Sequence, residues 1–126
     1  MAQHDVGTAT VDRIADAKVG DVVWLLDTQK ALHDAAGKYL GRGVWELRPI
    51  DAETRASFIV EYSKFDRKTG HERARSGYSS TRTIFGEQEK EDHEWLYKHR
   101  HALIAAIHAS DAGTIRRIAD VIGWKP

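Results

Sequence analysis

The chain has 126 residues, of which 41% are hydrophobic, enough for one domain with its own core. Its 19 basic and 19 acidic residues give a formal net charge of zero, so any attraction to nucleic acid must come from an uneven distribution of charge. The lack of cysteine excludes disulfides, thiolate zinc sites and cysteine nucleophiles and favours a cytoplasmic protein, and no apolar run is long enough to predict a membrane partner.

The first part of the chain predicts a tail followed by a buried strand. Residues 1–10 are small and polar without a signal-peptide pattern, so we expect a flexible tail before a single α+β domain over residues 11–126. The turn Val19-Gly20-Asp21 leads into Val22–Leu26, a short apolar run typical of a buried strand. The stretch from Lys18 to Trp24 resembles the entry to the first strand of many SH3-like small barrels.

A short internal helix is the next expected element. Asp27 or Thr28 can cap it, Ala31 and Leu32 lie on its apolar side, and Gly37 ends it after Ala36.

Further strands are expected between this helix and residue 86. The run Val44–Arg48 predicts a strand that ends at Pro49, and Asp51–Thr54 indicates a turn. Phe58, Val60 and Tyr62 alternate with polar residues, as on one face of a strand. Phe65–His71 indicates a hairpin turn closed by Gly70, and Thr81–Phe85 a final strand. Four to six strands within residues 19–86 would form a small, strongly bent antiparallel sheet or an SH3-like barrel.

Two helices are predicted at the C-terminal end, at about residues 87–109 and 111–122. On the first helix, seven residues share one arc and form an apolar stripe: Trp95, Leu96, His99, Ala102, Leu103, Ala106 and Ile107. Ser110 or Asp111 can cap the second helix, and Gly123 can end it. We expect the two helices to form a hairpin packed on the sheet.

Charge is concentrated in two neighbouring segments. Residues 64–82 contain six basic and two acidic residues, whereas residues 87–94 contain five acidic residues and Lys90. Basic side chains can bind phosphates, and the aromatic rings between them can stack on bases. Exposed hairpins are also often charged simply because charge blocks edge-to-edge pairing of strands. The predicted nucleic-acid-binding residues are Lys64, Arg67, Lys68, His71, Arg73, Arg75, Tyr78 and Arg82.

The end of the chain offers two more candidate residues. Thr114–Trp124 resembles the first helix and turn of helix-turn-helix DNA-binding domains, which implies contact with DNA. Only Lys125 and Pro126 follow where the recognition helix would stand, so we expect a packing helix whose Arg116 and Arg117 can still reach phosphate or a protein partner.

Histidines on the first long helix suggest a metal site, but their spacing is unsuitable. Ligands on one helix need a separation of three or four residues, and the fourth residues after His93 and His101 are Tyr97 and Ala105. We therefore expect no metal and no cofactor. His99 lies in the apolar stripe, where it is either a structural histidine bonded to a carbonyl or acid, or a pH-sensing one.

The sequence favours a binding role over catalysis. It contains no phosphate-binding glycine loop and no nucleophile elbow, so an enzyme is the less favoured interpretation. The leading hypothesis is a small non-enzymatic protein that contacts single-stranded or structured nucleic acid through the basic hairpin. The alternative is a protein-protein interaction module, inhibitor or adaptor, similar in size to regulatory proteins of mobile elements, which could also form a homo-oligomer.

Overall fold

The computed structural model describes residues 10–73 and 81–126, which form an α+β fold. These residues divide into two compact units, one that ends at Glu91 and one that comprises Asp92–Pro126. The tail predicted for residues 1–10 lies outside the described residues, apart from Thr10. The single domain over residues 11–126 stays a prediction.

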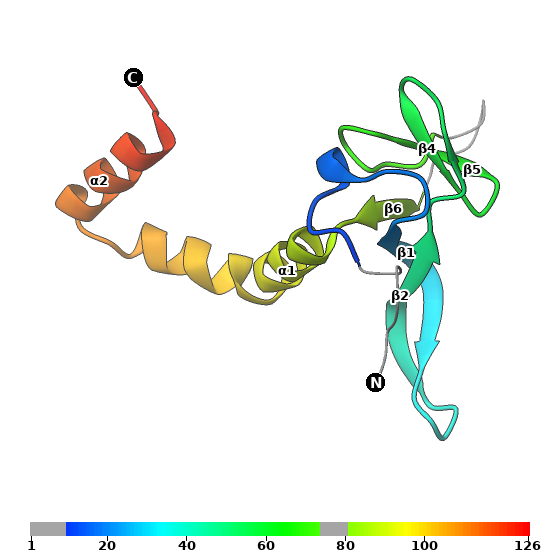
Figure 1. Ribbon diagram of the computed structural model, residues 1–126. Coiled ribbons are helices and arrows are strands. Elements are labelled where there is room, and N and C mark those ends of the chain that lie inside the picture. Colours follow the sequence, from blue (N-terminus) through cyan, green and yellow to red (C-terminus); the bar gives the residue numbers. More distant parts are fainter. Residues whose placement is uncertain (1–9, 74–80) are drawn as a thin grey trace. The chain divides into compact units, whose positions relative to one another are not determined.

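Six strands form two antiparallel sheets of three strands each (Figure 1). The predicted antiparallel pairing is confirmed, but the strands form two sheets instead of one bent sheet. The first sheet has the order β2-β1-β6, and the second the order β3-β4-β5. The strands are β1 (Val22–His33), β2 (Tyr39–Pro49), β3 (Ala52–Glu53), β4 (Ser57–Val60), β5 (Ser63–Asp66) and β6 (Arg82–Phe85). The strand predicted at Val22–Leu26 is therefore confirmed as part of β1.

Single bridges join the two sheets at one side. His71 pairs with Thr83 of β6, and Glu72 pairs with Phe65 of β5, so the residues after the β5 turn lie between the sheets. Gly70 has a φ of 79°, as expected for the residue that closes this turn. The described strands form no closed barrel, so the SH3-like alternative is not confirmed.

The hydrophobic core lies in the strand-containing unit. Its side chains alternate along the strands, with Val23 and Leu25 of β1 beside Ile84 of β6. The remaining members come from the turns, the second sheet and the segment before β1: Ile14, Ala17, Ile50, Phe58, Val60 and Phe65.

The short internal helix predicted from Asp27 or Thr28 to Ala36 is wrong. β1 continues through this segment to His33 and pairs with β2, with a register shift between Asp27 and Ala31. The Asp34 carboxylate accepts hydrogen bonds from the backbone N–H groups of Ala36 and Lys38, and Gly37 has a positive φ of 85°. The residues that resembled a helix end are thus a hairpin turn, because strand pairing overrides a weak helix propensity.

Two turns also differ from expectation. The turn predicted at Asp51–Thr54 is displaced, because Ala52–Glu53 form β3 and the Thr54 N–H donates to the carbonyl of Ser57. Tyr62, expected on the face of Phe58 and Val60, is instead fully exposed in a two-residue loop, where Glu61 and Tyr62 have positive φ angles of 49° and 66°.

α1 (Glu87–His108) begins at a tight junction with the segment before β1, which includes the 3-10 turn η1 (Ile14–Asp16). The first N–H groups of α1 donate to the carbonyls of Val11 and Asp12. The Glu89 carboxylate accepts from the backbone N–H groups of Gly86 and Ile14, which fits a capping interaction. A Cβ atom at Gly86 would overlap the Asp12 carbonyl, so only glycine fits there.

α2 (Ala112–Ile122) has the predicted caps at both ends. The Asp111 carboxylate accepts from the Thr114 N–H at 2.8 Å, Gly123 adopts the left-handed conformation, and the Trp124 N–H donates to the Ala119 carbonyl. Both predicted C-terminal helices are confirmed as elements. Within the described residues, neither one has the length and apolarity that crossing a membrane requires.

Candidate interaction surfaces

The predicted basic residue Arg82 is enclosed by acids. Its guanidinium lies 2.7 Å from a Glu72 oxygen and 3.2 Å from a Glu61 oxygen, and Ser63 accepts a further hydrogen bond. The hydrogen bond to Glu72 raises the pKa of Arg82 above its usual value. Its charge is therefore largely compensated within the protein.

Glu61 extends this arrangement to the other edge of the first sheet. Its second oxygen lies 2.7 Å from Arg48, which also contacts Glu46 at 2.8 Å. The hydrogen bond to Glu61 raises the pKa of Arg48, and that from Lys30 lowers the pKa of Glu46. A chain of alternating charges thus connects β2, the β4-β5 loop and β6.

Arg67 and Arg73 of the predicted nucleic-acid site also have acidic partners. Arg67 contacts Glu53 at 3.1 Å and lies over the Phe58 ring, 4.4 Å from its centroid. Arg73 lies 3.7 Å from Asp66. The sequence did not predict the pairs of Glu53 with Arg67 and of Glu61 with Arg82, because their partners lie 14 and 21 positions apart and only the fold brings them together.

The remaining described cations of the hairpin are exposed. Lys64, Lys68 and His71 have no ion pair among the described residues. Lys68 and Arg55 help to line a half-open hollow of about 660 Å³, whose other lining residues are Ile14, Ala15, Ala56, Asp66 and Arg67. Arg75 and Tyr78 lie outside the described residues.

Asp66 organises the turn that presents Lys68. Its carboxylate accepts hydrogen bonds from the backbone N–H groups of Lys68 and Thr69, at 2.8 and 3.0 Å. Both hydrogen bonds lower the pKa of Asp66, and the one from Thr69 has the larger effect. The turn is therefore held by a charged side chain that also compensates part of the basic charge.

One face of the first sheet carries a cluster of aromatic side chains that the sequence analysis did not predict. The Trp45 ring lies edge-on to Trp24 and to Phe85, with centroids 6.4 and 5.1 Å apart. Lys90 of α1 lies over both tryptophan rings, and the Trp24 indole N–H donates to Glu87. Because side chains alternate along β1, Trp24 lies on the face opposite the core. This position could have been predicted from the sequence.

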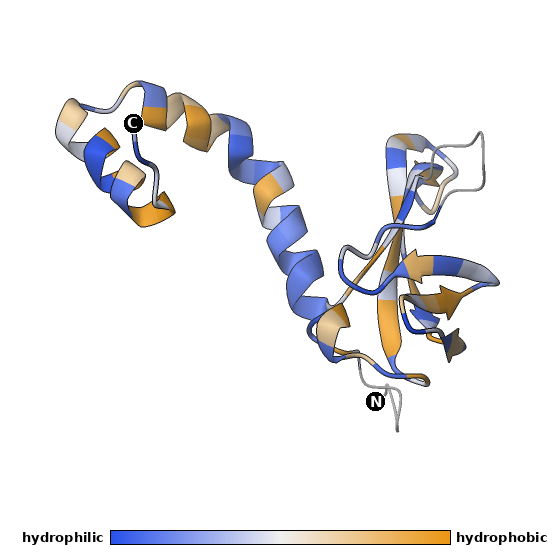
Figure 2. Cartoon of the chain, turned by 90° about the horizontal axis from the view of Figure 1, so that it is seen from above, coloured by the Kyte–Doolittle hydropathy of each residue, from blue (hydrophilic) through white to orange (hydrophobic). Residues whose placement is uncertain are grey.

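The helices display most of the exposed apolar side chains. Neither α1 nor α2 contains a buried residue. Of the fifteen large apolar residues that are exposed in the described chain, nine belong to the helical unit: Trp95, Leu96, Tyr97, Leu103, Ile104, Ile115, Val121, Ile122 and Trp124. Hydrophobic bands are visible on both helices in Figure 2. Arg116 and Arg117 are also exposed, on α2.

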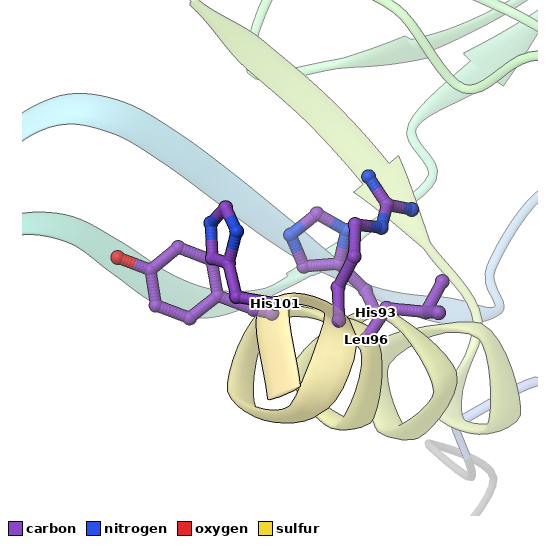
Figure 3. A pocket seen from close by; sticks show the side chains of 5 residues that line it. His93, Leu96 and His101 are labelled. Carbon is purple, nitrogen blue, oxygen red and sulfur yellow. The ribbon is translucent and has the colours of Figure 1, made fainter. Parts of the chain in front are cut away.

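His99 lies against a ring of its own helix. Its imidazole centroid is 4.9 Å from the Trp95 ring, one helical turn away, and within residues 10–73 and 81–126 His99 forms no hydrogen bond to a carbonyl or an acid. Next to the stripe, α1 carries a half-open hollow lined by His93, Leu96, Tyr97, Arg100 and His101, of which Leu96 also belongs to the stripe (Figure 3). No group of three potential metal ligands occurs within residues 10–73 and 81–126.

Comparisons with protein-family models, curated proteins and solved structures find no match to this chain.

Proposed function

We propose that the chain is a protein-interaction module whose docking surface lies on the helical unit Asp92–Pro126. The supporting observation is that α1 has no buried residue although Trp95, Leu96 and Leu103 of its apolar stripe are exposed. Exposed apolar patches of this kind mark interaction sites, and burial contributes roughly 25 cal/mol per Å². A partner that covers the α1 stripe would therefore stabilise the helices as it binds.

Affinity capture with the full chain tests this proposal. A tagged copy is produced together with an untagged copy in the same cell, and the retained proteins are identified by mass spectrometry. We expect retention of the untagged copy or of another protein, and loss of that retention with Leu103→Lys. Ile104→Lys is the matched control, because both side chains are 46% exposed and residue 104 lies outside the stripe. Retention that Leu103→Lys leaves unchanged, or no retention at all, contradicts the proposal.

Contact with nucleic acid through the hairpin is the second candidate function. It is favoured by the exposure of Lys64, Lys68 and His71 and by the basic hollow that Lys68 shares with Arg55. A salt titration with a single-stranded oligonucleotide tests it, since phosphate contacts weaken steeply with ionic strength. We expect Lys64→Ala with Lys68→Ala to weaken binding more than Arg73→Ala, whose guanidinium already has an acidic partner. No binding at low salt would exclude this function.

A further inference from the structure

The α1 stripe has the spacing of a surface that pairs with another helix. Trp95, His99, Ala102 and Ala106 follow one another at intervals of four, three and four residues, the repeat that keeps a seam on one side of a helix. Leu103 extends the stripe beside them and is 46% exposed. A partner that covers this stripe must therefore present a matching apolar strip of similar length.

Charge along α1 is divided between its two ends. Glu87–Glu94 contains five acidic residues and Lys90, which gives a net charge of minus four. Trp95–His108 contains Lys98 and Arg100, three histidines and no acid. A parallel pair of such helices would place acidic ends together, whereas an antiparallel pair places each acidic end beside a basic end.

Side-chain size follows the same division. Among the four seam positions, the bulky residue Trp95 lies near the acidic end, and the small residues Ala102 and Ala106 lie near the other end, with Leu103 and Ile107 beside them. Antiparallel pairing brings the large side chains of one helix toward the alanines of its partner. Parallel pairing would set Trp95 beside its own copy and alanine beside alanine, which leaves gaps.

We infer that the partner covering the α1 stripe is a second copy of this chain, with the two α1 helices antiparallel. This inference rests on the proposed interaction function and names its partner. A second copy offers the required strip, the complementary order of charges and a net charge of zero, so long-range repulsion does not oppose association.

Sedimentation equilibrium of the full chain over a range of concentrations tests for the dimer. We expect a reversible dimer that Leu103→Lys weakens at least tenfold and that Ile104→Lys, of equal exposure, leaves nearly unchanged. We also expect Lys98→Glu combined with Arg100→Glu to weaken it, because α1 then carries acids at both ends. The matched control is Arg116→Glu combined with Arg117→Glu, which makes the same change in charge on α2.

Spin labels determine the orientation. The chain has no cysteine, so His108→Cys provides a single labelling site. Antiparallel helices that overlap along the stripe place the two labels more than about 20 Å apart, whereas parallel helices place them at about 10 Å. The short distance would overturn the antiparallel arrangement.

A chain that stays monomeric at all concentrations would overturn the second copy as partner. The proposed function would then still stand if capture retained another protein in a Leu103-dependent manner, and both would fail if capture retained nothing.

Discussion

Arg82 and Glu72 are joined twice, once through their side chains and once through their backbones. The guanidinium contacts the Glu72 carboxylate at 2.7 Å, and the Glu72 N–H donates to the Arg82 carbonyl at 3.1 Å. Both side chains are about one-fifth exposed, so solvent screens this pair less than it screens a surface pair. The pair connects β6 to the segment that follows β5.

Glu72→Gln is expected to destabilise the strand-containing unit by about 1–3 kcal/mol, because it leaves a half-buried guanidinium without its strongest acceptor. Urea denaturation measures the change in the free energy of unfolding. Glu53→Gln is the control, since its pair with Arg67 is more exposed and should contribute less than about 1 kcal/mol. Equal losses in the two variants would show that burial of the Arg82 pair has no energetic effect.

Gly86→Ala is expected to destabilise the junction between η1 and α1. An added Cβ overlaps the Asp12 carbonyl, so the backbone must move and lose hydrogen bonds, at a cost of about 1–3 kcal/mol. Thermal or urea unfolding measures this cost. Gly113→Ala in α2 is the matched control, because its new methyl group meets only ordinary contacts and should favour the helix. A neutral Gly86→Ala variant would contradict the tight junction.

Tyr62→Gly is expected to stabilise the protein by about 1 kcal/mol, because tyrosine is strained at a φ of 66° and glycine is not. The side chain is fully exposed, so its removal sacrifices no packing. Tyr62→Ala separates the two effects, since alanine also lacks the ring but keeps the strain. The midpoints of urea unfolding should rank the glycine variant above both the alanine variant and the unchanged chain. Equal midpoints for glycine and alanine would contradict the explanation.

The first turn of α2 is expected to fray in acid. The hydrogen bond from the Thr114 N–H holds the pKa of Asp111 below its ordinary value. A carboxyl group whose pKa is lower in the folded state stabilises that state above the unfolded pKa and loses this effect as pH falls through the folded pKa. The transition should therefore lie below about pH 4 and appear in the chemical shift of the Thr114 amide.

Asp111→Asn is the control for this titration, because asparagine caps a helix without an ionisable group. Its Thr114 amide shift should show no transition in the same pH range. A transition of equal size in this variant would assign the effect to another acid.

Local patterns predicted much of the fold. The Asp111 and Gly123 caps, the positive φ at Gly70 and the continuous helical period from Glu87 each depend on a few neighbouring residues. The segment from Asp27 to Ala36 was misassigned because its strand conformation depends on pairing with β2, which no local pattern reveals.

The candidate surfaces were harder to predict, because charge compensation is a three-dimensional property. The six basic residues counted between 64 and 82 gave no indication that Glu53 and Glu61, outside that segment, contact Arg67 and Arg82. The apolar stripe was recognised from the helical period, but the period could not show that none of these side chains is buried.

The distribution of tryptophan gives each unit its own fluorescent reporter. Trp24 and Trp45 are half-buried in the strand-containing unit, whereas Trp95 and Trp124 are exposed in the helical unit. Unfolding of the first unit should shift its emission toward the red, while coverage of Trp95 should shift emission toward the blue. The two events therefore move the same spectrum in opposite directions and can be followed without any added dye.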